Sequence, residues 1–171
     1  MKFKIGQKVS YPNHGVCKIE DIGKRPDCET EFYSLRVLAN NSEIYVPTCN
    51  AEIIGIRPLI NDAESRGLMR FLAKDFEEPE KDWKIRTREF GEQLQTGDAF
   101  GVAEVLKKLV FLTHFKKLSF REQKMFERAK FLVVSELALA FSQKDQQIEK
   151  RVNKLLESAC RKHGLVSAIT H

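Results

Sequence analysis

The sequence predicts an α+β chain with a β-rich N-terminal region and an all-α C-terminal region. Before residue 60, short runs of β-forming residues alternate with turn residues. After it, apolar residues recur at the three- and four-residue spacing of helices. The chain has 171 residues, of which 42% are hydrophobic and 31% charged, so it can bury a core in one domain or two small ones. We expect two domains, over residues 1–60 and 61–171.

The N-terminal region is predicted to form a small, strongly bent antiparallel sheet or a partly open barrel. Turn residues separate its strands at positions 12–15, 25–27 and 40–42, where Pro, Asn, Asp and Gly supply fixed or left-handed backbone angles. The five expected strands are FKIG (3–6), KVSYP (8–12), GVCKIEDI (15–22), EFYSLRVLA (31–39) and EIYVP (43–47).

The C-terminal region is predicted to be a compact helical bundle with recognisable helix starts. Asn61 with Glu64 has the spacing of a capping box, in which side chain and backbone bond reciprocally. Pro79 suits the first turn of the next helix, because its missing N–H has no partner there and its φ already fits. That helix is expected to end near Gly97, before a further helix capped by Asp98.

Two more helices complete the expected bundle. Ser119 with Glu122 forms the second capping box and opens a helix whose apolar residues line one side as far as Ala140. The last helix carries apolar residues from Ile148 to Ala159, and the pair at residues 163–164, His followed by Gly, is typical of a C-terminal stop.

Nothing in the sequence supports an enzyme. It lacks the glycine-rich dinucleotide and phosphate-binding loops, the Gly-x-Ser-x-Gly elbow and the His-Glu-x-x-His zinc motif. Glu77 and Glu78 lie beside Pro79, where a solvated helix start explains paired carboxylates better than acid–base catalysis does. We therefore predict a protein without catalytic residues, without a cofactor and without a small-molecule substrate.

The expected location is the cytoplasm, with no membrane partner. No apolar run approaches the roughly 20 residues that span a bilayer, and residues 1–12 lack the apolar core of a signal peptide. The formal net charge of +5 favours polyanionic partners.

A zinc or thiol regulatory domain is one alternative. His14, Cys17, Cys28 and Cys49 are its conceivable ligands. Structural zinc sites usually bring their ligands in close pairs on tight turns, and only His14 and Cys17 are so spaced. The spacing favours free thiols over a metal site.

The single tryptophan, Trp83, has two readings. Its spacing from Phe90 and Leu94 is that of one helix face, which predicts a buried ring. Its position in the first turn of a helix, beside Lys84 and further cations, instead predicts an exposed ring that meets nucleic acid.

Ordered motifs along nearly the whole chain resemble the CarD/CdnL family of bacterial transcription regulators that bind RNA polymerase. The matching segments are FKIGQKVSYPNHGVCKIEDI (3–22), VPTCNAEIIGIRPLI (46–60), Trp83 with its basic residues, GDAFGVAEVLKKL (97–109) and LSFREQKMFERAKFLVVSELALA (118–140). The resemblance implies a Tudor-like polymerase-interacting module that docks on the β subunit. It also implies a helical domain that contacts promoter DNA at the upstream edge of the transcription bubble, where a tryptophan wedge stabilises the open complex.

Carried onto this sequence, the resemblance assigns candidate residues to two interfaces. Trp83 is the wedge, while Arg86, Arg88, Lys84 and Lys124 are phosphate or groove contacts. The polymerase contacts are assigned to Arg25 and to the strand residues Ile44, Tyr45, Val46 and Pro47, where edge backbone groups can extend a partner's sheet.

The resemblance places the protein at the nucleoid through RNA polymerase. A second alternative is an adaptor that binds only the polymerase and makes no productive contact with DNA.

Overall fold

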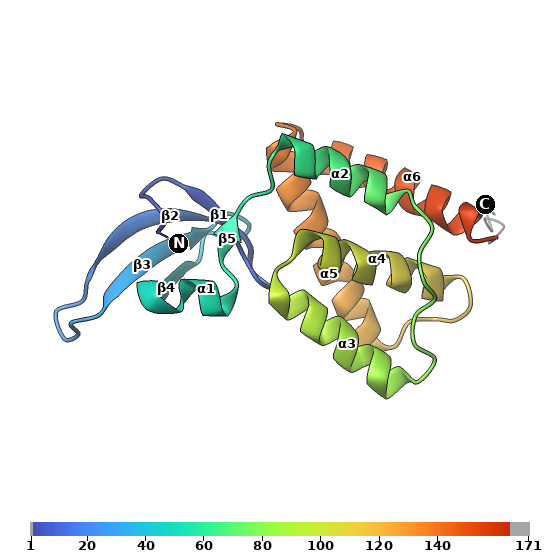
Figure 1. Ribbon diagram of the computed structural model, residues 1–171, viewed down its shortest axis with the longest axis horizontal. Coiled ribbons are helices and arrows are strands. Elements are labelled where there is room, and N and C mark those ends of the chain that lie inside the picture. The colour runs from blue at the N-terminus through green and yellow to red at the C-terminus, as the bar shows by residue number, and fades with distance from the viewer. Residues whose placement is uncertain (1, 165–171) are drawn as a thin grey trace. The chain divides into compact units, whose positions relative to one another are not determined.

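The structure is a computed structural model that describes residues 2–164. The chain divides into two compact units. The sheet unit runs up to Leu59 and includes Gln95–Gly97, and the helical unit comprises Ile60–Leu94 and the residues from Asp98 onward. Figure 1 shows strands in the former and long helices in the latter. The predicted α+β class is confirmed, whereas the domain boundary at residue 60 stays a prediction.

The sheet unit contains a single five-stranded antiparallel sheet within the described residues. Its order is β4-β3-β2-β1-β5, so that β4 and β5 form the two edges. The turn between β1 and β2 holds Asn13 at φ 64° and Gly15 at φ 82°, a left-handed region that Asn tolerates and Gly enters freely. The strands are β1 (Lys8–Tyr11), β2 (Gly15–Lys24), β3 (Glu31–Val37), β4 (Glu43–Pro47) and β5 (Arg57–Pro58).

The core of the sheet unit follows the two-residue period of its strands. On β2 and β3, Cys17, Ile19, Leu35 and Val37 are buried, because alternate side chains point to the same face. The short helices η1 (Thr48–Asn50) and α1 (Ala51–Ile54) follow β4, and Ala51 packs into this core.

The strand prediction is wrong at both ends of this unit. The expected strand FKIG is a turn, because Gln7 N–H donates to the Lys4 carbonyl at 3.0 Å and Gly6 adopts φ 85°. Phe3 instead fills the core, edge-on to Tyr33 at 5.6 Å between ring centroids. The fifth strand is β5, which pairs with β1. Two residues are too few to show strand alternation in a sequence.

The helical unit contains five helices within the described residues: α2 (Asp62–Leu72), α3 (Trp83–Thr96), α4 (Ala99–Thr113), α5 (Phe120–Ala140) and α6 (Asp145–Lys162). Both predicted capping boxes are present, at Asn61 and at Ser119. Asp98 caps α4 by accepting a hydrogen bond from Gly101 N–H. His163 is the C-cap of α6, and Gly164 follows with φ 80°, so the predicted helix ends are confirmed here.

The start of α3 differs from the prediction. Pro79 lies outside the helix, which begins at Trp83. Asp82 provides the cap, because its Oδ1 accepts a hydrogen bond from Lys84 N–H at 2.8 Å and its carbonyl accepts one from Arg86 N–H at 2.9 Å. A carboxylate at a helix start also interacts favourably with the helix dipole, which explains why the helix begins there.

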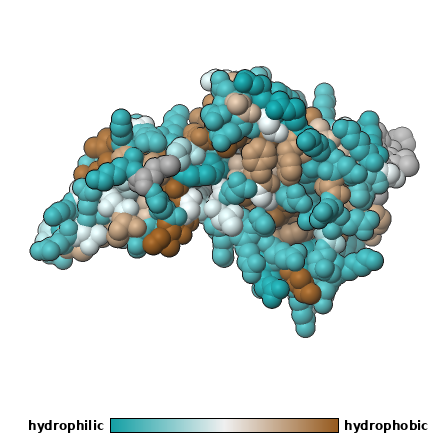
Figure 2. Space-filling model, in the orientation of Figure 1, coloured by the Kyte–Doolittle hydropathy of each residue, from teal (hydrophilic) through white to brown (hydrophobic). Residues whose placement is uncertain are grey.

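Apolar side chains of the helices pack into one extended core. Leu106 and Leu109 on α4, Leu137 on α5 and Ile148 on α6 are fully buried in it. On the face seen in Figure 2, hydrophilic residues cover most of the surface, with smaller apolar areas between them. None of the helices in residues 2–164 combines the length and hydropathy that a membrane span requires.

Candidate functional site

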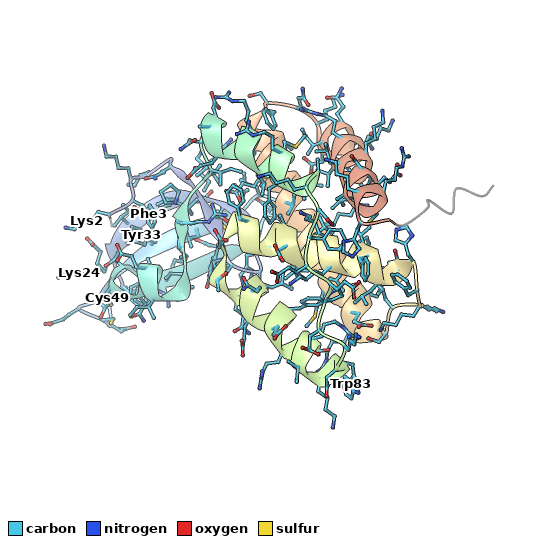
Figure 3. All side chains as sticks on the ribbon, turned by 45° about the vertical axis from the view of Figure 1, so that its right-hand side comes forward. Lys2, Phe3, Lys24, Tyr33, Cys49 and Trp83 are labelled. Carbon is cyan, nitrogen blue, oxygen red and sulfur yellow. The ribbon has the colours of Figure 1, made fainter. Side chains whose placement is uncertain are left out.

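Trp83, the first residue of α3, is exposed to solvent. Its side chain is 59% exposed, and Figure 3 shows it at the outer end of the helix. Lys84 Nζ lies 5.8 Å from the ring centroid, in cation–π range. Phe90 and Leu94 on the same helix are buried. The buried reading of Trp83 is therefore wrong, since the core receives the later turns of α3 and not the first.

Arg86, predicted to contact DNA, is instead buried in an ion pair. Its side chain is 5% exposed, and its Nη2 lies 2.8 Å from Glu122 Oε1 on α5. Its Nη1 donates to the carbonyls of Glu80 and Lys81, at 2.7 and 3.1 Å. These bonds direct the guanidinium toward α5 and the segment before Trp83. This arrangement contradicts a phosphate contact by Arg86, because the group is covered by protein.

Glu122 joins three segments at this end of the helical unit. It accepts hydrogen bonds from Arg86 on α3 and from Lys116 in the connection between α4 and α5, and it closes the capping box with Ser119. Burial alone raises the pKa of a carboxyl group. Here the bonds from Lys116, the Ser119 backbone and Arg86 outweigh it and lower the pKa of Glu122 to about 2.

The other predicted DNA contacts lie at the surface. Arg88 is exposed and lies 3.9 Å from Glu92, one turn along α3. Lys124 is exposed on α5, 3.8 Å from Glu127. Lys84 is exposed beside Trp83. Such solvated pairs are weak, so a phosphate can displace the carboxylates from these cations.

The residues predicted from the sequence do not include two exposed phenylalanines, one on each side of the connection between α4 and α5. Phe115 follows α4 and Phe120 opens α5, and both rings are mostly exposed. The sequence carries a signal for them, because two aromatic and four basic residues are interspersed in the segment FKKLSFREQK (115–124).

A pocket of about 540 Å³ lies beside the start of α3. Phe111, Leu112 and Phe115 form its apolar wall. Glu78 and Glu80 line it together with the basic residues Lys81, Arg86 and Lys116. The pocket thus combines an apolar wall with charges of both signs, and Arg86 and Lys116 are already paired with Glu122.

His163 anchors the connection between α2 and α3. Its Nδ1 lies 2.7 Å from Asp75 Oδ1, its Nε2 lies 3.5 Å from Glu78 Oε1, and its ring stacks on Phe76. The hydrogen bond to Asp75 is the main cause that raises the pKa of His163, because a carboxylate partner favours the imidazolium form.

The predicted polymerase strand, β4, is an edge strand of the sheet. Val37 N–H donates to the Ser42 carbonyl, and the same register pairs Ile44 with Leu35 and Val46 with Tyr33. Because hydrogen-bonded and non-hydrogen-bonded pairs alternate in an antiparallel ladder, the backbone groups of Glu43 and Tyr45 point outward from the sheet.

Pro47 shares this outward register, where its missing N–H costs no ladder bond. The edge therefore offers a partner strand the amide groups of Glu43 and Tyr45 and the carbonyl of Pro47.

The side chains of β4 divide between two faces. Val46 is buried in the core and Ile44 packs against it, so these two can reach a partner through their backbone but hardly through their side chains. Tyr45 is exposed, and the Arg25 guanidinium lies 4.1 Å from its ring centroid. Arg25 and Tyr45 therefore form one surface beside the edge, as the strand alternation requires.

The structure does not bring the conceivable zinc ligands together. In residues 2–164 no three His, Cys, Asp or Glu side chains converge as a metal site. Cys17 lies in the core of the sheet, where burial raises the pKa of its thiol to about 12, while Cys28 and Cys49 are exposed. A thiol so reluctant to ionise is a poor zinc ligand.

Each of the two units matches a known protein domain. The CarD-like/TRCF RID domain matches residues 3–60, and the C-terminal domain of CarD matches residues 67–153. A curated relative from Bacillus subtilis (strain 168), "Putative transcription factor YdeB", is 27% identical over 149 residues, 86% of this chain and 97% of the relative. The chain therefore belongs to the CarD/CdnL family and is a CarD-like transcription regulator that interacts with RNA polymerase.

Proposed function

We propose that the protein binds the β subunit of RNA polymerase through the β4 edge and stabilises the open promoter complex through Trp83. The observation that carries the proposal is the exposed indole at the start of α3, with Lys84 over its ring and Arg88 further along the same helix. Family membership supports the polymerase partner. The promoter contact rests on the chemistry of this surface.

The β4 edge supports docking by strand addition. The outward backbone groups of Glu43 and Tyr45 can bond to a strand of the β subunit, which gives affinity, while Arg25 and Tyr45 beside them add selectivity. Anchoring on the polymerase then raises the local concentration of the helical unit at the promoter, so weak contacts with DNA are sufficient.

The DNA contact must favour melted over closed DNA if it is to stabilise the open complex. Lys84 and Arg88 attract phosphates in either state and so give affinity without preference. The indole is different, because an apolar wedge in the minor groove holds a distortion that costs a few kcal/mol to create. Only this difference between the two states shifts the equilibrium toward the open complex.

The test is Trp83→Ala in open-complex kinetics. We expect the lifetime of the open complex to fall about tenfold, since base–aromatic contacts contribute roughly 1–3 kcal/mol. Binding to polymerase without DNA should stay at the wild-type level, because Trp83 is remote in sequence from the β4 edge. Trp83→Phe, which keeps an aromatic ring, is the matched variant and should retain part of the effect. An unchanged lifetime in the Ala variant would refute the wedge.

A further inference from the structure

A second exposed aromatic residue repeats the arrangement found at Trp83. Phe120 is the first residue of α5, and its side chain is 81% exposed. Lys124, one turn along the same helix, places Nζ 5.5 Å from the Phe120 ring centroid. The corresponding distance between Lys84 and Trp83 is 5.8 Å. The starts of α3 and α5 thus each carry an exposed aromatic ring with a lysine in cation–π range.

The two pairs belong to the same end of the helical unit. Arg86 on α3 contacts Glu122 on α5, which fixes the first turns of these helices against each other. Lys116 contacts the same carboxylate, so the connection between α4 and α5 is also attached at this point. Figure 1 shows that connection beside the start of α3. The first turns of α3 and α5 therefore lie at one end of the helical unit, and each presents an exposed aromatic ring there.

The surroundings of Phe120 are strongly basic. Residues 114–124 contain four Lys or Arg residues against one Glu, so four minus one leaves a net charge of +3, compared with +5 for the whole chain. The single acid, Glu122, is buried between Arg86 and Lys116. The exposed charges of residues 114–124 are therefore positive. Such a segment favours a polyanionic partner over a protein surface that carries charges of both signs.

The chemistry of phenylalanine favours single-stranded over duplex DNA as the ligand. A phenyl ring has no hydrogen-bonding group, so it cannot hydrogen-bond to base edges in a groove. It gains from contact with base faces, which neighbouring bases cover in duplex DNA and which become available when strands separate. Aromatic rings beside cations are the usual way in which proteins hold single strands.

We propose that Phe120 and Lys124 form a second DNA contact that stacks on an unpaired base at the upstream edge of the bubble. This inference rests on the proposed function of Trp83 and assigns the unpaired strand to α5. Phe120 supplies the stacking surface, and Lys124 neutralises the adjacent phosphate in exchange for its weak pairing with Glu127.

The test compares Phe120→Ala with Ile53→Ala in open complexes formed by the full-length protein and polymerase. Ile53 is the matched control, because it is 84% exposed but lies on α1 in the sheet unit. Both substitutions remove exposed apolar atoms, so neither should disturb folding. We expect Phe120→Ala to shorten the open-complex lifetime about fivefold or more, with Ile53→Ala unchanged.

Salt dependence separates stacking from charge. The lifetime of the Phe120→Ala complex should keep the wild-type dependence on salt, because a neutral ring releases no counterions. Lys124→Gln should reduce the slope against the logarithm of salt concentration by about one. A photo-crosslinking p-benzoylphenylalanine at position 120 should label a promoter strand at the upstream bubble edge.

The possible outcomes distinguish this proposal from the function on which it rests. If Trp83→Ala shortens the lifetime and Phe120→Ala behaves like Ile53→Ala, the second contact is wrong and the wedge stands. If neither variant shortens it, both fail. A crosslink from position 120 to polymerase subunits with none to DNA also overturns the second contact, since it identifies a protein partner for Phe120.

Discussion

At the scale of single residues, two arginines on one helix have opposite roles. Arg86 and Arg88 are two positions apart on α3, where a helix turns its side chains by about 200°. Arg86 therefore faces the bundle and pairs with Glu122, whereas Arg88 faces solvent. The buried guanidinium holds the carbonyls of Glu80 and Lys81, directly before Trp83. It thereby positions the start of α3.

Arg86→Gln and Arg88→Gln should separate the two roles. The first removes one partner of a buried ion pair and should lower the free energy of unfolding by about 3 kcal/mol, whereas the second should change it by less than about 0.5 kcal/mol. Urea unfolding measures both. Trp83 is the only tryptophan in the chain, so the quenching of its fluorescence by acrylamide should report a loosened helix start in Arg86→Gln only.

DNA binding should show the reverse pattern. Arg88→Gln should reduce the salt dependence of promoter binding by about one counterion, while Arg86→Gln leaves the slope near the wild-type value. A stable Arg86→Gln variant with a reduced slope would restore Arg86 as a phosphate contact.

At the scale of elements, the connection between α2 and α3 is held by basic side chains. Lys107 and Lys162 donate to the carbonyls of Phe71 and Ala73 at the end of α2, at 2.8 Å each. His163 then binds Asp75 and Glu78. Cations at the C-terminal end of a helix complement its dipole. This connection leads directly to Trp83, so its attachment constrains where the helix of the tryptophan begins.

The His163 contact predicts a defined pH dependence of stability. The pKa of His163 is raised in the folded state by Asp75 and Glu78, so its contribution is complete below the unfolded pKa of about 6.5 and is lost as pH rises through the folded pKa. The pKa of Asp75 is lowered by the same bond, so the contribution of Asp75 is lost only in acid.

Urea unfolding at pH 6 and pH 8.5 tests this for wild type and His163→Asn, whose amide can occupy the place of Nδ1 but cannot carry charge. The wild type should lose more stability than the variant as pH rises. The other histidines are present in both proteins, so the difference between the two losses belongs to His163. Equal losses would show that the His163 contact makes no pH-dependent contribution.

At the scale of the whole molecule, the proposed function needs both units. Tyr45→Pro should weaken polymerase binding, because it removes an outward N–H of β4 that no strand within the sheet uses. Tyr45→Ala is the matched control, since it removes the side chain but keeps that N–H. A larger loss in the proline variant assigns the binding energy to the strand edge.

Combining Tyr45→Pro with Trp83→Ala tests the dependence of one unit on the other. At protein concentrations where Tyr45→Pro abolishes docking, Trp83→Ala should shorten the open complex no further, because weak DNA contacts require the anchored state. At saturating protein the effect of Trp83 should return. Independent, additive losses at low concentration would show that the helical unit acts on DNA without the polymerase anchor.

Much of the fold could be predicted from local pattern. The capping boxes at Asn61 and Ser119 and the central strands depend on residues within one turn or one hairpin, and they lie where expected. Three elements differ from the prediction: the first strand, the fifth strand and the start of α3. Phe3 packs into the core and does not form the expected first strand. Strand β5 has too few residues to show an alternating pattern. Helix α3 is capped by Asp82 and so begins after Pro79, which was expected in its first turn.

Local sequence patterns are enough to predict the α+β class, most of the helix starts and Trp83 as a candidate DNA contact. Which basic neighbours of Trp83 are exposed to a ligand depends instead on how the helices pack. Helical spacing says which residues share a face, but Glu122, 36 residues beyond Arg86, decides that one arginine is covered. Burial depends on such distant partners, so exposure at Trp83 and Phe120 follows from packing and not from local sequence.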